Sequence, residues 1–252
     1  MTSAQPTNHA SEFLPFIIRF GAISLALSGL LFVLYPAVRP WHDESTVGGA
    51  LSSMSSNAWV AAHLFAILAL ILMPLGMLGL CALAAGSRGL RLTFAATVVM
   101  WIGAGLTLPY YGAEDFALHA IARQVRSGAS LDLLGLVDAI RFGAVAATTF
   151  AAGLVLLGVG GVLAAISIWR TAILPRFSGV PLAIGLVLLI PQFYLPAWAR
   201  IAHGVLVAIG LLWLAWVLWT KKADRIASRL GTDGPAAPPS DDQPSKRISA
   251  RS

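Results

Sequence analysis

The sequence predicts an all-α membrane protein with six transmembrane helices in one bundle and a disordered C-terminal tail. Three observations support this prediction. Hydrophobic residues make up 58% of the 252 residues and charged residues only 11%, whereas soluble domains carry about a quarter charged residues. The apolar residues gather in runs of about 20 or more, which is the length that crosses about 30 Å of hydrocarbon. After Thr220 the composition changes abruptly to basic residues and then to a stretch rich in Pro, Ser and Asp.

The low charge content excludes several classes of protein. So few charged residues cannot cover a soluble globule with polar side chains, which excludes a soluble enzyme and a nucleic-acid-binding protein, and so much apolar content excludes a mostly disordered chain. The net charge of +6 comes from 17 basic and 11 acidic residues. Most of this excess stands at the ends of apolar runs, where it sets membrane orientation. Cys81 is the only cysteine, so an internal disulfide and a thiolate metal cage are both excluded.

Six apolar stretches are long enough to cross a bilayer. They cover residues 13–38, 57–85, 90–112, 142–169, 175–196 and 197–220. The first stretch is too long for a signal peptide and lacks a small-residue cleavage site, so we expect an uncleaved helix. Residues 1–12 form an N-terminal leader and residues 13–220 the six-helix domain. Residues 221–252 form a tail that is first basic and then disordered, since its later part has almost nothing to bury.

Glycine and proline within the spans indicate close helix packing and kinks. Small residues such as Gly103 and Gly153 let helix backbones approach each other. Proline also interrupts several spans, for example at Pro109 and Pro191. We expect neighbouring helices to satisfy the carbonyls that these prolines leave without a donor.

The basic residues predict the orientation in the membrane. Eight of them fall on one side of the predicted bundle: Arg88, Arg91, Arg170, Arg176, Lys221, Lys222, Arg225 and Arg229. The other side carries Arg39, Arg123, Arg126, Arg141 and Arg200, spread over longer connections and mixed with acidic residues. The positive-inside rule therefore places both termini in the cytoplasm and the protein in the cell membrane. An even number of spans agrees with this orientation.

Polar residues gather at the outer ends of the predicted spans. His63 and His203 lie at similar depths, because each follows the start of an inward-running span by a few residues. Glu114, Asp115 and His119 follow the third span on the same side. Ionisable residues inside a span are costly and usually mark function. These five residues are therefore the candidate polar cluster.

The acidic pair after the third span predicts specific contacts. If the span continues as a helix, Asp115 and His119 are four residues apart and share a face. Such a pair can bind a metal jointly or tune the histidine as an acid or base, and it also occurs on amphipathic helices at the membrane surface. We expect at least one of Glu114 and Asp115 to point inward and to be paired. His119 is the local candidate partner, and Arg141 or Arg200 the distant one.

The surroundings of His63 and His203 resemble each other. Each histidine follows an Ala-Trp pair, at Trp59 and Trp198 respectively. This similarity fits a degenerate repeat that relates the first two spans to the last two, as in transporters built from duplicated units. It fits equally well with chance in a chain rich in alanine and tryptophan, in which case the two tryptophans are interfacial anchors.

Two segments resemble those of small multi-pass membrane proteins of actinobacterial type. They are residues 35–44, with the sequence YPAVRPWHDE, and residues 109–114, with the sequence PYYGAE. The resemblance covers the six-span region and implies a bacterial membrane protein, but it implies no activity and no site residue. Two families with known chemistry fit less well. Six-helix haem cytochromes need intramembrane histidines on both sides, and metal hydrolases of the ceramidase kind typically carry an HxxxH pair, which this sequence lacks.

Three classes of function fit these observations. The favoured class is a non-enzymatic membrane protein, such as a small transporter, a sensor or a partner subunit. The second is an outward-facing zinc site with a hydrolytic activity, held by His63, His203 and a third ligand from His119, Asp115 or Glu114, with an open position for water. The third is a single haem b between His63 and His203 for electron transfer. Expected partners are the lipid bilayer and a partner subunit or second copy, and no nucleic acid.

Overall fold

The computed structural model describes residues 9–171 and 174–232, which form helices joined by turns, with no strand among them. Five helices within these ranges are long and apolar enough to cross a membrane. They are α1 (His9–Val38), α3 (Asn57–Ala84), α4 (Leu90–Gly112), α7 (Ala144–Thr171) and α9 (Ala197–Thr232). The predicted all-α class is therefore confirmed. The disordered part of the predicted tail, from residue 233, and most of the predicted leader lie outside the described residues.

Shorter elements join these helices. They are α2 (Val47–Met54), the π-helical turn η1 (Ala113–Leu118), α5 (His119–Arg126), α6 (Leu133–Phe142), α8 (Val180–Val187) and the 3-10 turn η2 (Pro191–Tyr194). Thr46, Ser56 and Asp132 start α2, α3 and α6, because each side chain accepts a hydrogen bond from a main-chain N–H in the first turn. Helix α4 continues through η1 into α5 without interruption. Helices α2 and α6 were not predicted from the sequence, and a continuation of the helix past Gly112 was considered only as one alternative.

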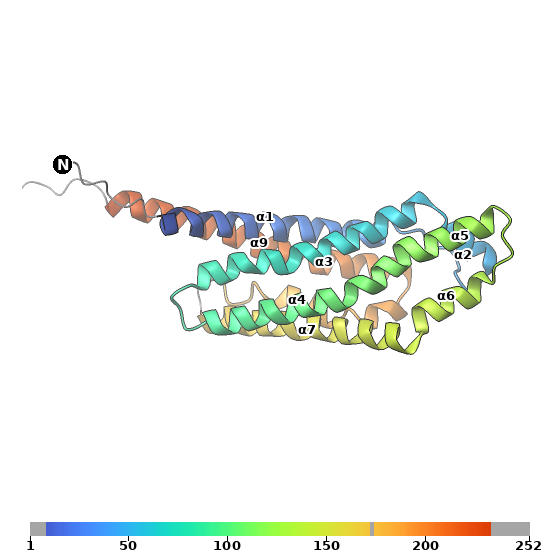
Figure 1. Cartoon of the computed structure of the whole chain (residues 1–252). Helices are drawn as coiled ribbons and strands as arrows, with labels where there is room; N and C mark the ends of the chain where they lie inside the picture. The colour runs from blue at the N-terminus through green and yellow to red at the C-terminus, as the bar shows by residue number, and fades with distance from the viewer. Residues whose placement is uncertain (1–8, 172–173, 233–252) are drawn as a thin grey trace, which may run out of the picture.

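The long helices close into a ring (Figure 1). Helix α1 packs against α3 and α9, α3 packs against α4, and α4 packs against α7, while α8 lies between α7 and α9. The start of α1 and the end of α9 lie at the same end of this ring, which we call the terminal end. Helices α2, α5 and α6 gather at the opposite end around their own apolar cluster, which includes Met54, Trp59 and Leu118. We call this second end the capped end.

The predicted fifth span, residues 175–196, is not one continuous helix. Helix α8 ends at Val187, and a turn separates it from η2, which begins at Pro191. Proline has no N–H to donate to the carbonyl of Val187, four residues earlier, and its ring would clash with that carbonyl. The segment still passes from the terminal end to the capped end, since α7 and α9 both run the opposite way (Figure 1). The structure thus replaces the predicted helix by two short helices and a turn.

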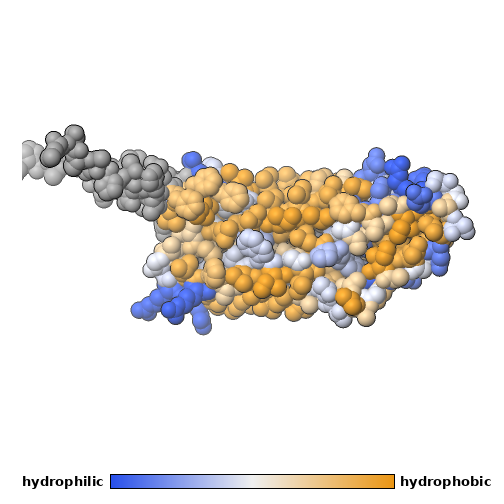
Figure 2. All heavy atoms as spheres, viewed as in Figure 1, coloured by the Kyte–Doolittle hydropathy of each residue, from blue (hydrophilic) through white to orange (hydrophobic). Residues whose placement is uncertain are grey.

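Apolar side chains cover the sides of the bundle. Figure 2 shows them over most of its length, with hydrophilic residues gathered at the two ends. Large apolar side chains are exposed on several of the long helices, for example Phe16 on α1 and Trp216 on α9. A continuous apolar surface of this kind is unfavourable in water. It suits a protein embedded in a membrane.

The contact between α1 and α3 depends on two glycines, which yields the first prediction. A Cβ atom added to Gly21 would lie 2.6 Å from the Cα of Gly79. Replacing Gly21 by leucine should therefore force the helices apart and reduce the free energy of unfolding by about 1–3 kcal/mol. The midpoint of thermal unfolding in detergent measures this loss. Gly105 on α4 has no atom within 4 Å of its Cβ position, so Gly105→Leu is the matched control, and an equal loss in both variants would contradict the prediction.

Candidate functional site

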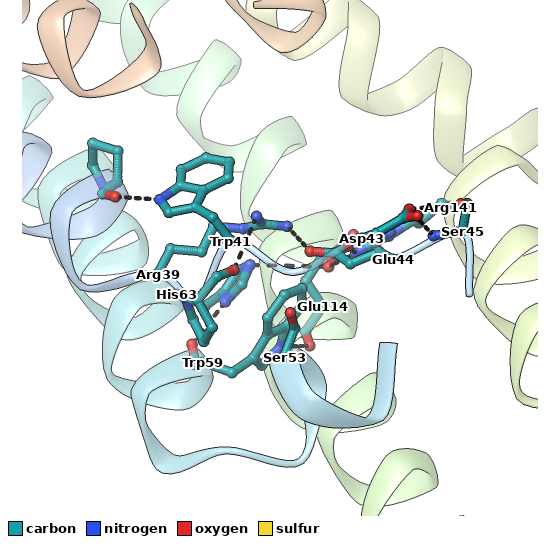
Figure 3. A network of polar contacts seen from close by, with 12 residues as sticks. Arg39, Trp41, Asp43, Glu44, Ser45, Ser53, Trp59, His63, Glu114 and Arg141 are labelled. Atoms are coloured by element: carbon teal, nitrogen blue, oxygen red, sulfur yellow. Dashed lines mark hydrogen bonds and ion pairs between the residues drawn. The ribbon is translucent and has the colours of Figure 1, made fainter. Parts of the chain in front are cut away.

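Four charged side chains form a connected network at the capped end (Figure 3). Arg141 on α6 binds Glu114 on η1 through Nε and Nη2, at 2.6 and 2.8 Å from the two carboxylate oxygens. Nη2 of Arg141 also lies 2.9 Å from Oε2 of Glu44, and Oε1 of Glu44 lies 2.6 Å from Nη2 of Arg39. We call Arg39, Glu44, Glu114 and Arg141 the arginine–glutamate network. It connects the end of α1 and the following loop to η1 and α6.

The network is largely shielded from solvent. Glu114 is only 5% exposed. Burial disfavours the charged form of Arg141, but hydrogen bonding to Glu114 and the charges of Glu114 and Glu44 outweigh it and raise the pKa of Arg141 above its usual value. Bidentate pairs of arginine with carboxylate are also among the strongest polar contacts in proteins. Arg141 therefore stays charged at any physiological pH.

Of the two adjacent carboxyl groups, Glu114 forms the predicted kind of pair and Asp115 does not. Glu114 points inward and binds Arg141, one of the predicted partners. Asp115 is fully buried, and neither of its oxygens has a hydrogen-bond partner. Nδ1 of His119 instead lies 2.7 Å from the carbonyl oxygen of Met54. Because η1 is π-helical, the four-residue spacing on which the Asp115–His119 pair was predicted does not hold here.

Trp59 and His63 connect α3 to this network. Nε1 of Trp59 donates to the main-chain oxygen of Glu114 at 2.7 Å. Nδ1 of His63 lies 2.8 Å from the main-chain oxygen of Trp59, and since a carbonyl can only accept, Nδ1 must carry a proton. Nε2 of His63 faces Oε2 of Glu114 across 3.9 Å, which is too far for a direct hydrogen bond. Nδ1 of His63 is thus held by the main chain, whereas Nε2 only faces the carboxylate of Glu114.

A cavity of about 460 Å³ lies beside the network, and His63 forms part of its wall. We call it the polar cavity. Aromatic rings from five elements line it together with the charged groups: Tyr35, Tyr110, Tyr111, Phe142, Phe150, Phe193 and Tyr194. The cavity occupies the capped end of the ring, where α8 has already ended and only η2 stands between α7 and α9. The helix break at Pro191 therefore makes room for it.

The polar cavity contains more arginine than carboxylate. Three arginines line it, at positions 39, 141 and 200, together with Glu44 and Glu114. Both glutamates are already engaged by Arg39 and Arg141 in the network. The lining groups, with both glutamates ionised, thus leave one positive charge without a counter-charge.

Arg200 is the arginine without an acidic partner. In the part of the chain that the structure describes, no carboxylate lies within ion-pair distance of its guanidinium. Nε of Arg200 donates to Oε1 of Gln192 at 3.1 Å. Its guanidinium carbon lies 4.7 Å from the ring centre of Trp41 and 5.1 Å from that of Phe193, within the range of cation–π attraction. Aromatic rings and an amide thus hold Arg200 in place while leaving its charge uncompensated.

His203 lies outside the polar cavity and has a structural contact. Its Nε2 lies 2.7 Å from the carbonyl oxygen of Gly185, in the last turn of α8, where carbonyls lack a helical donor. The similar segments around Trp59 and Trp198 also differ in the structure. Trp59 is fully buried, whereas Trp198 is 73% exposed. The two histidines therefore have different surroundings despite their similar sequences.

The predicted metal ligands are not brought together. His63, His119 and His203 each contact a different main-chain carbonyl. Among the residues that the structure describes, no group of three His, Cys, Asp or Glu side chains could hold a metal ion. The predicted haem pair is not preformed either, since Nε2 of His203 is engaged by Gly185. His63 and His203 are held apart because α1 packs between α3 and α9, the helices that carry them.

Two members of the network, Arg39 and Glu44, were not among the predicted site residues. Arg39 was considered for orientation, and Glu44 only as part of the segment of residues 35–44 on which the resemblance rests. A charge of each sign five residues apart at the end of a span was the available signal, and Arg39 and Glu44 do form an ion pair. Their link to Arg141 crosses a hundred residues of sequence and depends on tertiary structure.

Comparison with known proteins returned no relative. No family model matches the chain, and no curated protein and no solved structure is significantly similar to it. The chemistry of the polar cavity is therefore the basis for assigning a function.

The network yields the second prediction. Replacing Glu114 by alanine would leave Arg141 buried with half of its partners, and breaking a buried ion pair typically costs about 3–5 kcal/mol. We expect a loss of stability of this order, measured as thermal unfolding in detergent. Asp138→Ala is the matched control, because Asp138 is exposed on the same helix as Arg141. Asp132 would be a poorer control, since its side chain caps α6.

A double variant separates the ion pair from general effects of position 114. Glu114→Ala combined with Arg141→Met removes both charges, so it should lose less stability than the sum of the two single variants. Strict additivity, or a Glu114→Ala variant as stable as Asp138→Ala, would show that the pair does not stabilise the capped end.

Proposed function

We propose that the protein is a non-enzymatic membrane protein of the transporter or sensor class whose polar cavity binds a small organic anion. The observation that carries this proposal is the charge balance of the cavity, in which Arg200 faces no carboxylate within ion-pair distance among the described residues. A poorly hydrated cation without a counter-ion is unfavourable. An anion in the cavity would remove this cost.

The chemistry of the lining residues indicates the kind of anion. The planar fork of arginine matches carboxylate and phosphate groups. The rings of Tyr111 and Phe150 offer apolar surface beside this charge, which favours an organic anion over a bare inorganic ion. A volume of about 460 Å³ falls in the range of small-molecule sites. Interrupted membrane helices next to a binding site recur in transporters, and the break between α8 and η2 fits that pattern.

The proposed placement is in a bacterial cell membrane with the terminal end in the cytoplasm. The connections between α3 and α4 and between α7 and α8 lie at the terminal end (Figure 1). These connections and the adjoining helix ends carry Arg88, Arg91, Arg170 and Arg176, and the positive-inside rule assigns such residues to the cytoplasm. The broken segment, residues 175–196, would then cross the membrane in addition to the five long helices. The polar cavity would face the outside.

Reporter fusions test this placement, which is the third prediction. Fusions after Gly86, Gly128 and Thr220 should read inside, outside and inside respectively, because these positions lie at the terminal, capped and terminal ends. An outside signal after Thr220 would reverse the orientation and turn the polar cavity towards the cytoplasm.

Anion binding is the fourth prediction. In lipid nanodiscs we expect calorimetric binding of hexanoate or hexyl phosphate, and much weaker binding of uncharged hexanol. Arg200→Gln should weaken anion binding by about ten- to a hundredfold, since a hydrogen bond to a charged group contributes roughly 1.5–3 kcal/mol. Arg123→Gln is the matched control, because Arg123 is exposed at the same end of the molecule.

Two outcomes would contradict the proposal. Equal binding of hexanol and hexanoate would show that charge is not recognised. Equal losses in the Arg200 and Arg123 variants would show that the effect comes from net charge rather than from the cavity. Thermal unfolding of Arg200→Gln must be measured in parallel, because Arg200 also binds Gln192.

A further inference from the structure

An apolar groove on the outer surface of the bundle adjoins the polar cavity. It lies between α7 and α8, has a volume of about 330 Å³, and is lined only by apolar residues, among them Val155, Val159 and Val187. Leu154 and Ile190 line both the groove and the polar cavity. The groove and the polar cavity therefore adjoin at these two residues, with charged groups on one side and apolar groups on the other.

The groove opens towards the surroundings of the bundle rather than into its core. Val155 is 53% exposed, Val187 is 52% exposed and Val159 is 44% exposed. Two residues of the wall of the polar cavity, Phe142 and Tyr194, are also strongly exposed. An aromatic ring with a polar tip, such as that of Tyr194, is typical of the membrane interface. A ligand could thus enter sideways from the bilayer.

We infer that the anion bound by the polar cavity is the head group of a single-chain amphiphile, and that its alkyl chain lies in the groove between α7 and α8. This inference rests on the proposed function, because the head group is the anion that Arg200 recognises. The charge of the cavity matches the head, and the apolar lining of the groove matches the chain. Because the two spaces share Leu154 and Ile190, one molecule with a charged head and an alkyl chain could occupy both.

The dimensions favour one chain over two. The groove residues on α7 run from Leu154 to Leu163, about 14 Å of helix at 1.5 Å per residue, which is the reach of a medium-length chain. A second space adjoins the polar cavity beside Tyr35 and Tyr111, but its volume of about 30 Å³ suits water rather than an alkyl chain. A two-chain lipid would have to leave one chain outside the groove.

Photo-crosslinking in phosphatidylcholine nanodiscs tests the inference, which is the fifth prediction. The probe is dodecanoate with a diazirine near the end of its chain, and the neutral dodecanol analogue reports labelling by lipid contact alone. We expect the acid to label residues of the groove on α7 and α8 preferentially. Excess hexanoate and the Arg200→Gln substitution should both reduce this labelling to the level of the alcohol.

A filled groove provides the second arm of the experiment. Val159→Trp should abolish preferential labelling while leaving hexanoate binding within about twofold of the unmodified protein, since the head-group contacts are unchanged. Val98→Trp is the matched control, because Val98 on α4 is similarly exposed at 39% and does not line the groove.

The outcomes separate this inference from the proposed function. If hexanoate binds through Arg200 but the acid labels the exposed faces of α1, α4 and α9 as readily as α7 and α8, the chain does not lie in the groove and the inference is wrong. If hexanoate itself does not bind, the proposed function is wrong and the inference falls with it. Unchanged labelling in Val159→Trp would also overturn the inference.

Discussion

The capped end of the bundle is organised around one main-chain hydrogen bond that cannot form, the bond from Pro191 to the carbonyl of Val187. Because α8 stops there, its last carbonyls need other donors, and His203 supplies one to Gly185. The position between α7 and α9 is then left to η2, and the polar cavity lies beside it. Gln192 of η2 in turn binds Arg200. A single proline thus opens the site and also helps to position its unpaired cation.

The arginine–glutamate network determines which charge in the cavity is left for a ligand. Glu114 binds Arg141 through both of its carboxylate oxygens, and Glu44 is shared between Arg141 and Arg39. With both carboxylates engaged, Arg200 receives contacts from aromatic rings and an amide, which hold a guanidinium without neutralising it. The network therefore does two things at once, since it joins α6 to the bundle and keeps Arg200 available.

Length and hydropathy were sufficient to predict the long helices. The predicted ends at Val38 and Gly112 and the predicted starts at Asn57 and Leu90 agree with α1, α3 and α4, because an uninterrupted apolar run has few alternatives to a helix in a membrane. In the fifth span, Pro191 was expected to kink the helix, but average hydropathy does not show that the helix ends before it. Helices α2, α5 and α6 were missed or left open because they are short and depend on packing at the capped end.

The histidines show why the candidate site could be predicted only in part. Counting residues from the start of a span gives the depth of a side chain, and His63 and His203 do both lie towards the capped end. Depth does not give the direction in which a side chain points around the helix, nor which helices are neighbours in the ring. Placing α1 between α3 and α9 sends the two imidazoles to different carbonyls. Arginine is less sensitive to this limit, because its long side chain reaches across a helix interface from several positions. An arginine partner for Glu114 could therefore be expected from the sequence. A metal site could not be placed in this way, because it needs several ligands within about 2 Å of one point.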